Sequence, residues 1–177
     1  MSSTFNVISD KSDVVIRMML TLYIFSEVYV GILLIDYYKA HKEWFTQISK
    51  QIRLFPPIWM IQLIWAFVYF MLGSSLYLFY KNANDIFDNN NDHTVDSVTF
   101  LFIVNIMLNK LYPFVFLKMR FVRAALMMIT LNILTSIGIA ILFALNGKWT
   151  EFGTFLPYPL WASFLFYINL MFVIIKK

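Results

Sequence analysis

Residues 56–81 read PPIWMIQLIWAFVYFMLGSSLYLFYK, and this stretch decides the class of fold. At about 1.5 Å per residue, a helix over its apolar run is long enough to cross a hydrocarbon layer of about 30 Å. Trp65, Tyr69, Gly73 and Tyr77 recur every four residues and therefore share one helix face. Rings with a polar edge, in line with a glycine where another backbone could approach, suit a protein-facing pocket wall better than a face turned to lipid. Ordinary helix packing with an aromatic belt explains the same spacing.

The composition indicates a membrane protein. Of 177 residues, 60% are hydrophobic and 19% are aromatic, which is more apolar surface than a soluble domain of this size could bury. The net charge is only +4, and no basic run interleaved with aromatic residues suggests binding to nucleic acid. The chain has no cysteine and two histidines, so we expect no disulfide, no metal site and no resident cofactor.

The remaining apolar stretches complete the fold. We predict an all-α integral membrane protein, a bundle of five transmembrane helices forming a single domain over residues 1–177. The predicted helices cover 14–35, 56–80, 98–117, 122–145 and 155–175. Between the first two helices, residues 36–55 suit a partly amphipathic segment at the membrane interface, and the polar residues 82–97 suit a solvated loop.

The basic residues predict the orientation of this multi-pass protein in the lipid bilayer. Five helices put the two ends of the chain on opposite sides of the membrane. Nine of the fourteen Lys and Arg residues lie in 36–55, 118–123 and 176–177. Cytoplasmic loops carry an excess of positive charge, so we expect the C-terminus to face the cytosol.

Three stretches carry a resemblance to a known family. The spacing Pro56-Pro57-x-Trp59, followed by Trp65 and Tyr69, resembles the second helix of the translocator protein family. This family is also called tryptophan-rich sensory protein or peripheral-type benzodiazepine receptor.

The third and fifth predicted helices are similar to the same family. Asn105 and Asn109 precede Pro113, as two amide residues precede a Trp-x-Trp-Pro run in the family. In the fifth helix, FLPYPLW over 155–161 with Asn169 eight residues later resembles the family pattern.

This chain also departs from the family at three of the matched positions. Lys110 and Tyr112 replace the two tryptophans of the third helix. Leu165 is larger than the Ala or Gly that is common in the family, and we expect it to narrow any cavity behind it.

The resemblance implies a membrane receptor that binds tetrapyrroles such as protoporphyrin IX, or other planar hydrophobic ligands, in an intramembrane pocket. Trp65 and Trp161 match tryptophans that line this pocket, and Tyr69, Asn109 and Leu165 complete the expected ligand-binding set. In some bacterial members these tryptophans support light-dependent porphyrin breakdown, so both are the candidate catalytic residues.

Other functions are open at this point. The protein could transport porphyrin or lipid across the membrane. It could also be a membrane scaffold, in which the Gly73-Ser74-Ser75 patch packs against a second copy to form a homodimer. Cholesterol should bind weakly or not at all, because Leu170 and Ile174 stand where a proposed sterol motif needs tyrosine and arginine.

Two charged residues fall inside predicted helices. Glu27 and Lys110 each lie twelve or thirteen residues into a helix that starts from the same side of the membrane, a rise of about 20 Å. A charge at that depth is costly unless it is paired. We therefore predict an ion pair between Glu27 and Lys110, with contact to a charged group of the ligand as the alternative.

Overall fold

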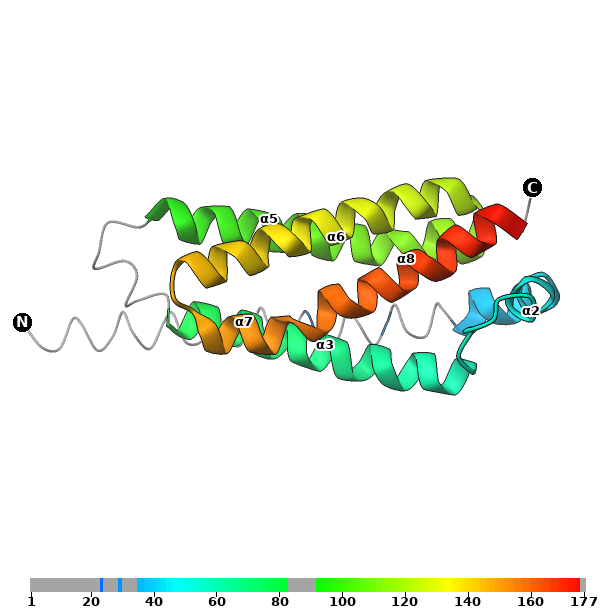
Figure 1. Ribbon diagram of the computed structural model, residues 1–177, viewed down its shortest axis with the longest axis horizontal. Helices are drawn as coiled ribbons and strands as arrows, with labels where there is room; N and C mark the ends of the chain where they lie inside the picture. Colours follow the sequence, from blue (N-terminus) through cyan, green and yellow to red (C-terminus); the bar gives the residue numbers. More distant parts are fainter. Residues whose placement is uncertain (1–22, 24–28, 30–34, 83–91, 176–177) are drawn as a thin grey trace, which may run out of the picture.

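The computed structural model describes residues 23, 29, 35–82 and 92–175, and every regular element in these residues is helical (Figure 1). The elements are α2 (Lys42–Ser49), α3 (Ile58–Lys81), α5 (Asp92–Pro113), the π-helical turn η1 (Phe114–Lys118), α6 (Val122–Leu145), α7 (Trp149–Phe155) and α8 (Pro157–Ile175).

Four helices in the described part of the chain are long and apolar enough to cross a membrane. They are α3, α5 continued by η1, α6, and α7 continued by α8. The predicted first helix, 14–35, lies largely outside the described residues, although Tyr23, Tyr29 and residues 35–40 are helical. The number of five transmembrane helices therefore stays a prediction.

Helices α5 and α6 pack along inward faces with alternating spacings of three and four residues. Such spacing keeps one face of each helix toward its neighbour at a shallow crossing angle. The buried positions are Val98, Phe102, Asn105, Asn109, Tyr112 and Phe116 in α5 and η1, and Val122, Ala125, Ile129, Asn132, Ser136, Ile139 and Phe143 in α6. A β-carbon at Gly138 would lie 3.2 Å from Leu101, so the two helices approach closely there.

Side chains from three helices form a buried hydrogen-bonded cluster at this contact. Asn105 Nδ2 donates to the backbone oxygen of Asn132 (3.1 Å), and Asn132 Nδ2 donates in return to the backbone oxygen of Asn105 (3.2 Å). The Tyr158 hydroxyl of α8 donates to Asn132 Oδ1 (2.9 Å). Because lipid offers no alternative partner, this cluster holds α5, α6 and α8 in one register.

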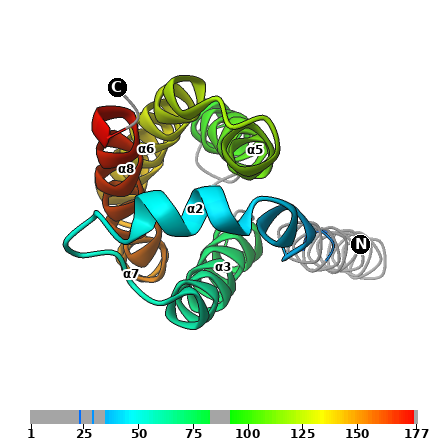
Figure 2. The same ribbon diagram turned by 90° about the vertical axis from the view of Figure 1, so that its right-hand side faces the viewer.

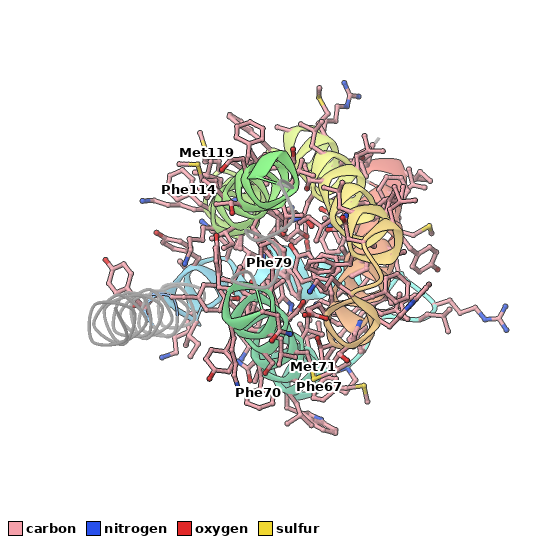
Figure 3. The ribbon with its side chains drawn as sticks, turned by 90° about the vertical axis from the view of Figure 1, so that its left-hand side faces the viewer. Phe67, Phe70, Met71, Phe79, Phe114 and Met119 are labelled. Carbon is pink, nitrogen blue, oxygen red and sulfur yellow. The ribbon has the colours of Figure 1, made fainter. Side chains whose placement is uncertain are left out.

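The outer surface is apolar. Figure 3 shows Phe79 pointing into the bundle, whereas Phe67 and Phe70 of the same helix lie at its outer edge. Phe79 is buried, while Phe67 and Phe70 are exposed. This distribution suits a bundle surrounded by lipid.

Some helix boundaries differ from those predicted. Helix α5 begins at Asp92, six residues before the predicted start, so part of the polar stretch 82–97 is helical. Residues 149–154, which lie between the predicted helices 122–145 and 155–175, are helical and belong to α7, because Glu151 and Phe155, four residues apart, both face the bundle. The chain turns at Leu156, where Pro157 starts α8 without needing a backbone donor.

Pro113 ends the regular part of the third predicted helix. Proline has no N–H and its ring clashes with the preceding turn, so the hydrogen-bond ladder is interrupted. The five residues after it form a π-helical turn, in which Met119 N donates to Phe114 O (3.1 Å). This turn leaves Phe116 buried inside the bundle.

Helix α2 lies across one end of the bundle (Figure 2). Its Phe45 and Ile48 are buried, as is Ile52 just after it. The segment predicted at the membrane interface is thus a short helix whose apolar face covers the bundle. At the same end, the Arg120 guanidinium lies 2.8 Å from His41 Nδ1 and links this segment to the α5–α6 connection.

Candidate functional site

The four residues of the predicted aromatic face of α3 do not share one environment. Trp65 and Tyr69 are half-buried, their ring centroids lie 5.0 Å apart, and both pack against the core. A β-carbon at Gly73 would lie 3.5 Å from the ring of Tyr23, so Gly73 faces the N-terminal segment. Tyr77 is exposed. Only the first two members of the face are therefore turned toward the interior.

Trp161, Leu165 and Asn169 lie on the inward face of α8, four residues apart, and all three are buried. The indole Nε1 of Trp161 has no hydrogen-bond partner among the described residues, and neither has Asn169 Oδ1. Asn169 Nδ2 donates to the backbone oxygen of Leu165 (2.8 Å) and to the hydroxyl of Tyr112. The inward face of α8 thus carries one unused donor and one unused acceptor.

Asn109 and Tyr112 lie on the inward face of α5, and Tyr112 contacts Asn169 of α8. Both are buried. The Tyr112 ring stacks on Phe116 at 5.7 Å with an interplanar angle of 7°, which fixes the direction of its hydroxyl. Tyr112 stands where the resembling family has tryptophan, and here its hydroxyl joins α5 to α8 through Asn169.

The predicted site residues of three helices lie at a similar depth. From the end of the bundle covered by α2, Tyr69 lies about 17 Å along α3, Leu165 about 15 Å along α8 and Asn109 about 14 Å along α5 and η1, at about 1.5 Å per residue. Trp65 lies about one turn nearer to that end, and Trp161 about one turn farther from it.

The packing of the inward faces is uneven at this depth, since Asn169 is fully buried whereas its neighbours on α8 and α5 keep a small accessible surface. Trp161 and Asn109 each keep 9% of their surface accessible, and Leu165 keeps 8%. Nearer to α7, the inward-facing Phe143 and Phe155 keep 1% and 0%. We call the group Trp65, Tyr69, Asn109, Tyr112, Trp161, Leu165 and Asn169 the inner site.

The two tryptophans of the inner site do not touch each other. Trp65 contacts Tyr69, and Trp161 packs against Phe164 with ring centroids 5.4 Å apart. Among the described rings, none is in contact with both indoles. They instead pack against the same core from α3 and α8. A ligand-binding role for these residues stays a prediction.

Sequence reasoning missed the aromatic cap over this site. Phe45 of α2 packs against Phe55 (5.4 Å), Phe172 (5.7 Å) and Phe116 (6.4 Å), and Trp44 packs against Phe172 (5.8 Å). This aromatic cap joins α2, η1 and α8 at the end of the bundle covered by α2, one helical turn beyond Tyr112. The spacing of Phe45, Ile48 and Ile52, at three and four residues, is the signal that could have revealed it.

The scaffold hypothesis requires the patch Gly73-Ser74-Ser75 to pack against a second copy of the protein. In the structure, two of these residues contact other segments of the same chain. Gly73 faces Tyr23. Ser75 is buried, and its hydroxyl donates to the backbone oxygen of Glu151 in α7 (3.0 Å). Ser74 bonds within its own helix, to the backbone oxygen of Phe70 (2.8 Å).

The ion pair expected between Glu27 and Lys110 cannot be compared in full, since Glu27 lies outside the described residues. Lys110 is half-buried, and its Nζ lies 5.9 Å from the centre of the Tyr23 ring. Lys110 therefore faces the N-terminal segment and not the inner site. The ion pair stays a prediction.

The sequence was compared with profiles of protein families. The profile of the TspO/MBR family matches residues 20–175. The chain belongs to the TspO/MBR family. This confirms the family to which the sequence resemblance pointed. Comparison with curated proteins and with solved structures finds no match.

Membership of the TspO/MBR family and the four apolar helices agree on the class of protein. This TspO/MBR-family chain is an integral, multi-pass membrane protein built from helices. The inner site lies between three of the helices that are long enough to cross the membrane.

Proposed function

We propose that this TspO/MBR-family protein is an intramembrane receptor for flat, hydrophobic ligands of the tetrapyrrole class, with protoporphyrin IX as the reference ligand. The observation that carries the proposal is the unpartnered indole N–H of Trp161 on the inward face of α8. A buried donor without an acceptor is costly, and a ligand with a nitrogen or oxygen acceptor would supply the missing partner.

The walls of the inner site support a planar ligand. Trp65 and Tyr69 present aromatic surface from α3, and Trp161 presents it from α8. Sites for small hydrophobic molecules combine such apolar walls with a few polar groups that set the orientation. Leu165 narrows the space between these walls, so the ligand should lie edge-on to it.

The aromatic cap formed by α2, η1 and α8 would close the site toward the aqueous side. Phe45 and its aromatic neighbours cover the end of the bundle nearest the inner site. We propose that this end faces the cytosol, because the exposed Lys39, Lys42, Lys118 and Arg120 gather there.

Tryptophan fluorescence in nanodiscs tests the receptor proposal. Protoporphyrin IX should quench the wild-type protein saturably, and Trp161→Phe should weaken binding about tenfold through loss of one buried hydrogen bond and part of the ring contact. Trp65→Phe should weaken it less, because the phenyl ring keeps the apolar wall.

The chain offers matched controls for that experiment. Trp59 and Trp149 are 63% and 66% exposed on the outside of the bundle, so Trp59→Phe and Trp149→Phe should leave the affinity within twofold. Equal affinity of the wild type and the Trp65→Phe, Trp161→Phe double variant would refute the assignment of the site.

Light-dependent breakdown is a second candidate function that depends on the same two indoles. An oxidisable indole beside an excited porphyrin is the chemistry it needs, and Trp161 is placed on the inward face. Loss of porphyrin absorbance under illumination, abolished by Trp65→Phe with Trp161→Phe but not by Trp149→Phe, would support it. Binding without loss of absorbance would leave the receptor function alone.

A further inference from the structure

The outward surfaces of α5 and α6 end in basic residues at the same end of the bundle. On α5 and η1, exposed residues recur at spacings of three and four and therefore form one outward row. Toward the end covered by α2, this row reads Ile103, Met107, Leu111, Phe114 and Lys118. Four apolar side chains are thus followed by a lysine.

Helix α6 shows the same pattern in the opposite chain direction. Its outward row runs from Leu134 through Leu131 and Met127 to Arg123, and all four residues are exposed. The two rows are neighbours, because α5 and α6 pack side by side (Figure 2). Long basic side chains at the ends of apolar helices extend to the membrane interface, so Lys118 and Arg123 lie at the level of the phospholipid headgroups.

Aromatic rings hold Lys118 in place. Its Nζ lies 4.9 Å from the ring centre of Phe114 and 5.3 Å from that of Tyr37. The two rings meet edge to face at 6.2 Å, so Lys118 joins η1 to the helical residues 35–40. Figure 3 shows Phe114 and Met119 at the outer edge of the bundle. Lys118 makes no hydrogen bond or ion pair with a described residue, so its ammonium group keeps its donors for a ligand.

The connection between η1 and α6 adds a third cation. Arg120 adopts the left-handed backbone conformation (φ 55°) in the short turn between these two helices. Its guanidinium contacts His41 Nδ1 (2.8 Å), which keeps the side chain at this end of the bundle. We call Lys118, Arg120 and Arg123 the basic turn.

The charge of this end favours an anionic ligand. In the described residues 35–55 and 114–123, seven Lys and Arg residues stand against two acidic residues, and all nine are exposed. The acidic residues are Asp36 and Glu43, and the basic turn itself contains none. A lipid with a net negative headgroup therefore gains more here than a zwitterionic lipid, whose own cation would meet the same basic side chains.

We propose that the basic turn, together with Tyr37, binds the phosphate headgroup of an anionic phospholipid, with phosphatidylglycerol as the reference lipid. Lys118 and Arg123 donate hydrogen bonds to the phosphate oxygens, and the Tyr37 ring positions the Lys118 ammonium group. The acyl chains lie along the apolar outward rows of α5 and α6, which continue from these two residues. The occupant is a lipid and not a soluble phosphate, because only a lipid also covers those apolar rows.

Native mass spectrometry of the full chain, released from detergent micelles, tests this proposal. Dioleoyl phosphatidylglycerol and dioleoyl phosphatidylcholine have the same acyl chains and differ in net charge, so the affinity of the first bound molecule of each is compared. Phosphatidylglycerol should bind at least about tenfold more tightly, because each basic residue near an anionic headgroup changes the affinity about fivefold. Raising the salt concentration should reduce this preference.

Variants locate the preference. Lys118→Gln and Arg123→Gln should each lower the affinity for phosphatidylglycerol about fivefold and leave that for phosphatidylcholine within about twofold. Lys118→Arg keeps the charge and should keep the affinity. Lys81→Gln is the matched control, because Lys81 is an exposed lysine whose Nζ lies 6.0 Å from the Tyr77 ring at the opposite end of the bundle. It should leave both affinities unchanged.

Three results would overturn the proposal. Equal affinity for the two lipids, or a preference that survives both Lys118→Gln and Arg123→Gln, means that the basic turn is not a headgroup site. A loss in Lys81→Gln as large as in Lys118→Gln means that the lipid is attracted by charge in general. Displacement of phosphatidylglycerol by excess glycerol 3-phosphate means that the ligand is a soluble phosphate.

The readouts keep this proposal separate from the receptor function. The basic turn lies on the outside of the bundle, so Lys118→Gln and Arg123→Gln should bind protoporphyrin IX with the affinity of the wild type. Circular dichroism and elution as a single species show that each variant is folded. Loss of lipid preference with intact porphyrin binding supports the headgroup site, and loss of both in a folded variant refutes it.

Discussion

Asn132→Leu should destabilise the bundle by about 1 to 3 kcal/mol. The substitution keeps the backbone oxygen of Asn132, to which Asn105 Nδ2 donates, and roughly keeps the side-chain volume. It removes two hydrogen bonds between helices: Asn132 Nδ2 to the Asn105 backbone oxygen (3.2 Å), and the Tyr158 hydroxyl to Asn132 Oδ1 (2.9 Å). Side-chain hydrogen bonds between membrane helices average about 0.6 kcal/mol and reach about 1.7 kcal/mol, which sets the range.

Equilibrium unfolding in mixed detergent–lipid micelles, followed by circular dichroism, measures this change. Thr130→Val is the control on the same helix, because Thr130 is exposed and bonds only to the backbone oxygen of Leu126 one turn before it (2.7 Å). It should change the free energy of unfolding by less than about 0.5 kcal/mol.

A double-mutant cycle assigns the loss to the contact between α6 and α8. Tyr158→Phe removes the donor of one of the two bonds, so Asn132→Leu should cost less in that background, by about 0.6 to 1.7 kcal/mol. Strict additivity of the two substitutions, or an Asn132→Leu protein as stable as the wild type, would refute the view that the buried amide joins these helices.

Three further substitutions test other contacts. Phe45→Ala should weaken the packing of α2 on the bundle by about 3 kcal/mol, because it removes the central ring of the aromatic cap. Hydrogen exchange of the α2 amides, measured by mass spectrometry, should then be about a hundredfold faster. Ser75→Ala should lower the free energy of unfolding by about 1 kcal/mol, because it removes a bond to α7, whereas Ser74→Ala, which removes a bond within α3, should change it by a few tenths. Gly73→Leu should cost about 1 to 3 kcal/mol in unfolding experiments through crowding with the Tyr23 ring, and Tyr23→Ala should relieve most of that cost.

Each of these has a result that contradicts it. Unchanged exchange in α2 would mean that Phe45 does not hold the helix on the bundle. Equal effects of the two serine substitutions would remove the distinction between contacts within a helix and between helices. A Gly73→Leu protein whose stability does not depend on Tyr23 would mean that Gly73 does not pack against the Tyr23 ring.

The long apolar segments were readable from the sequence because length and hydropathy alone determine whether a helix can cross a membrane. The prediction of 122–145 coincides with α6, which has no proline and no charged residue beyond Arg123. Short elements were harder to predict. Helix α7 and the start of α5 are polar enough to resemble loops. In α7, the burial of Glu151 and Phe155 against the bundle accompanies the regular structure, and the local sequence does not reveal this packing.

The inner site shows the same division between sequence and structure. The amide residues of α5 and the aromatic residues of α3 and α8 were identified as candidates from their spacing and from the family resemblance. The contacts that surround these residues could not be predicted, because hydrogen bonds between helices, such as that from Asn169 to Tyr112, join residues 57 positions apart in the chain.

The sequence by itself determined that this protein is a helical membrane protein of the TspO/MBR family, since those properties depend on composition, on segment length and on local motifs. Only the tertiary structure decided which side chains face one another. A four-residue spacing advances about 40° beyond a full turn at each step. The four residues from Trp65 to Tyr77 therefore turn gradually around α3, from the core at Trp65 to the outside of the bundle at Tyr77. The segments that pack against α3 decide which of these residues face the inner site.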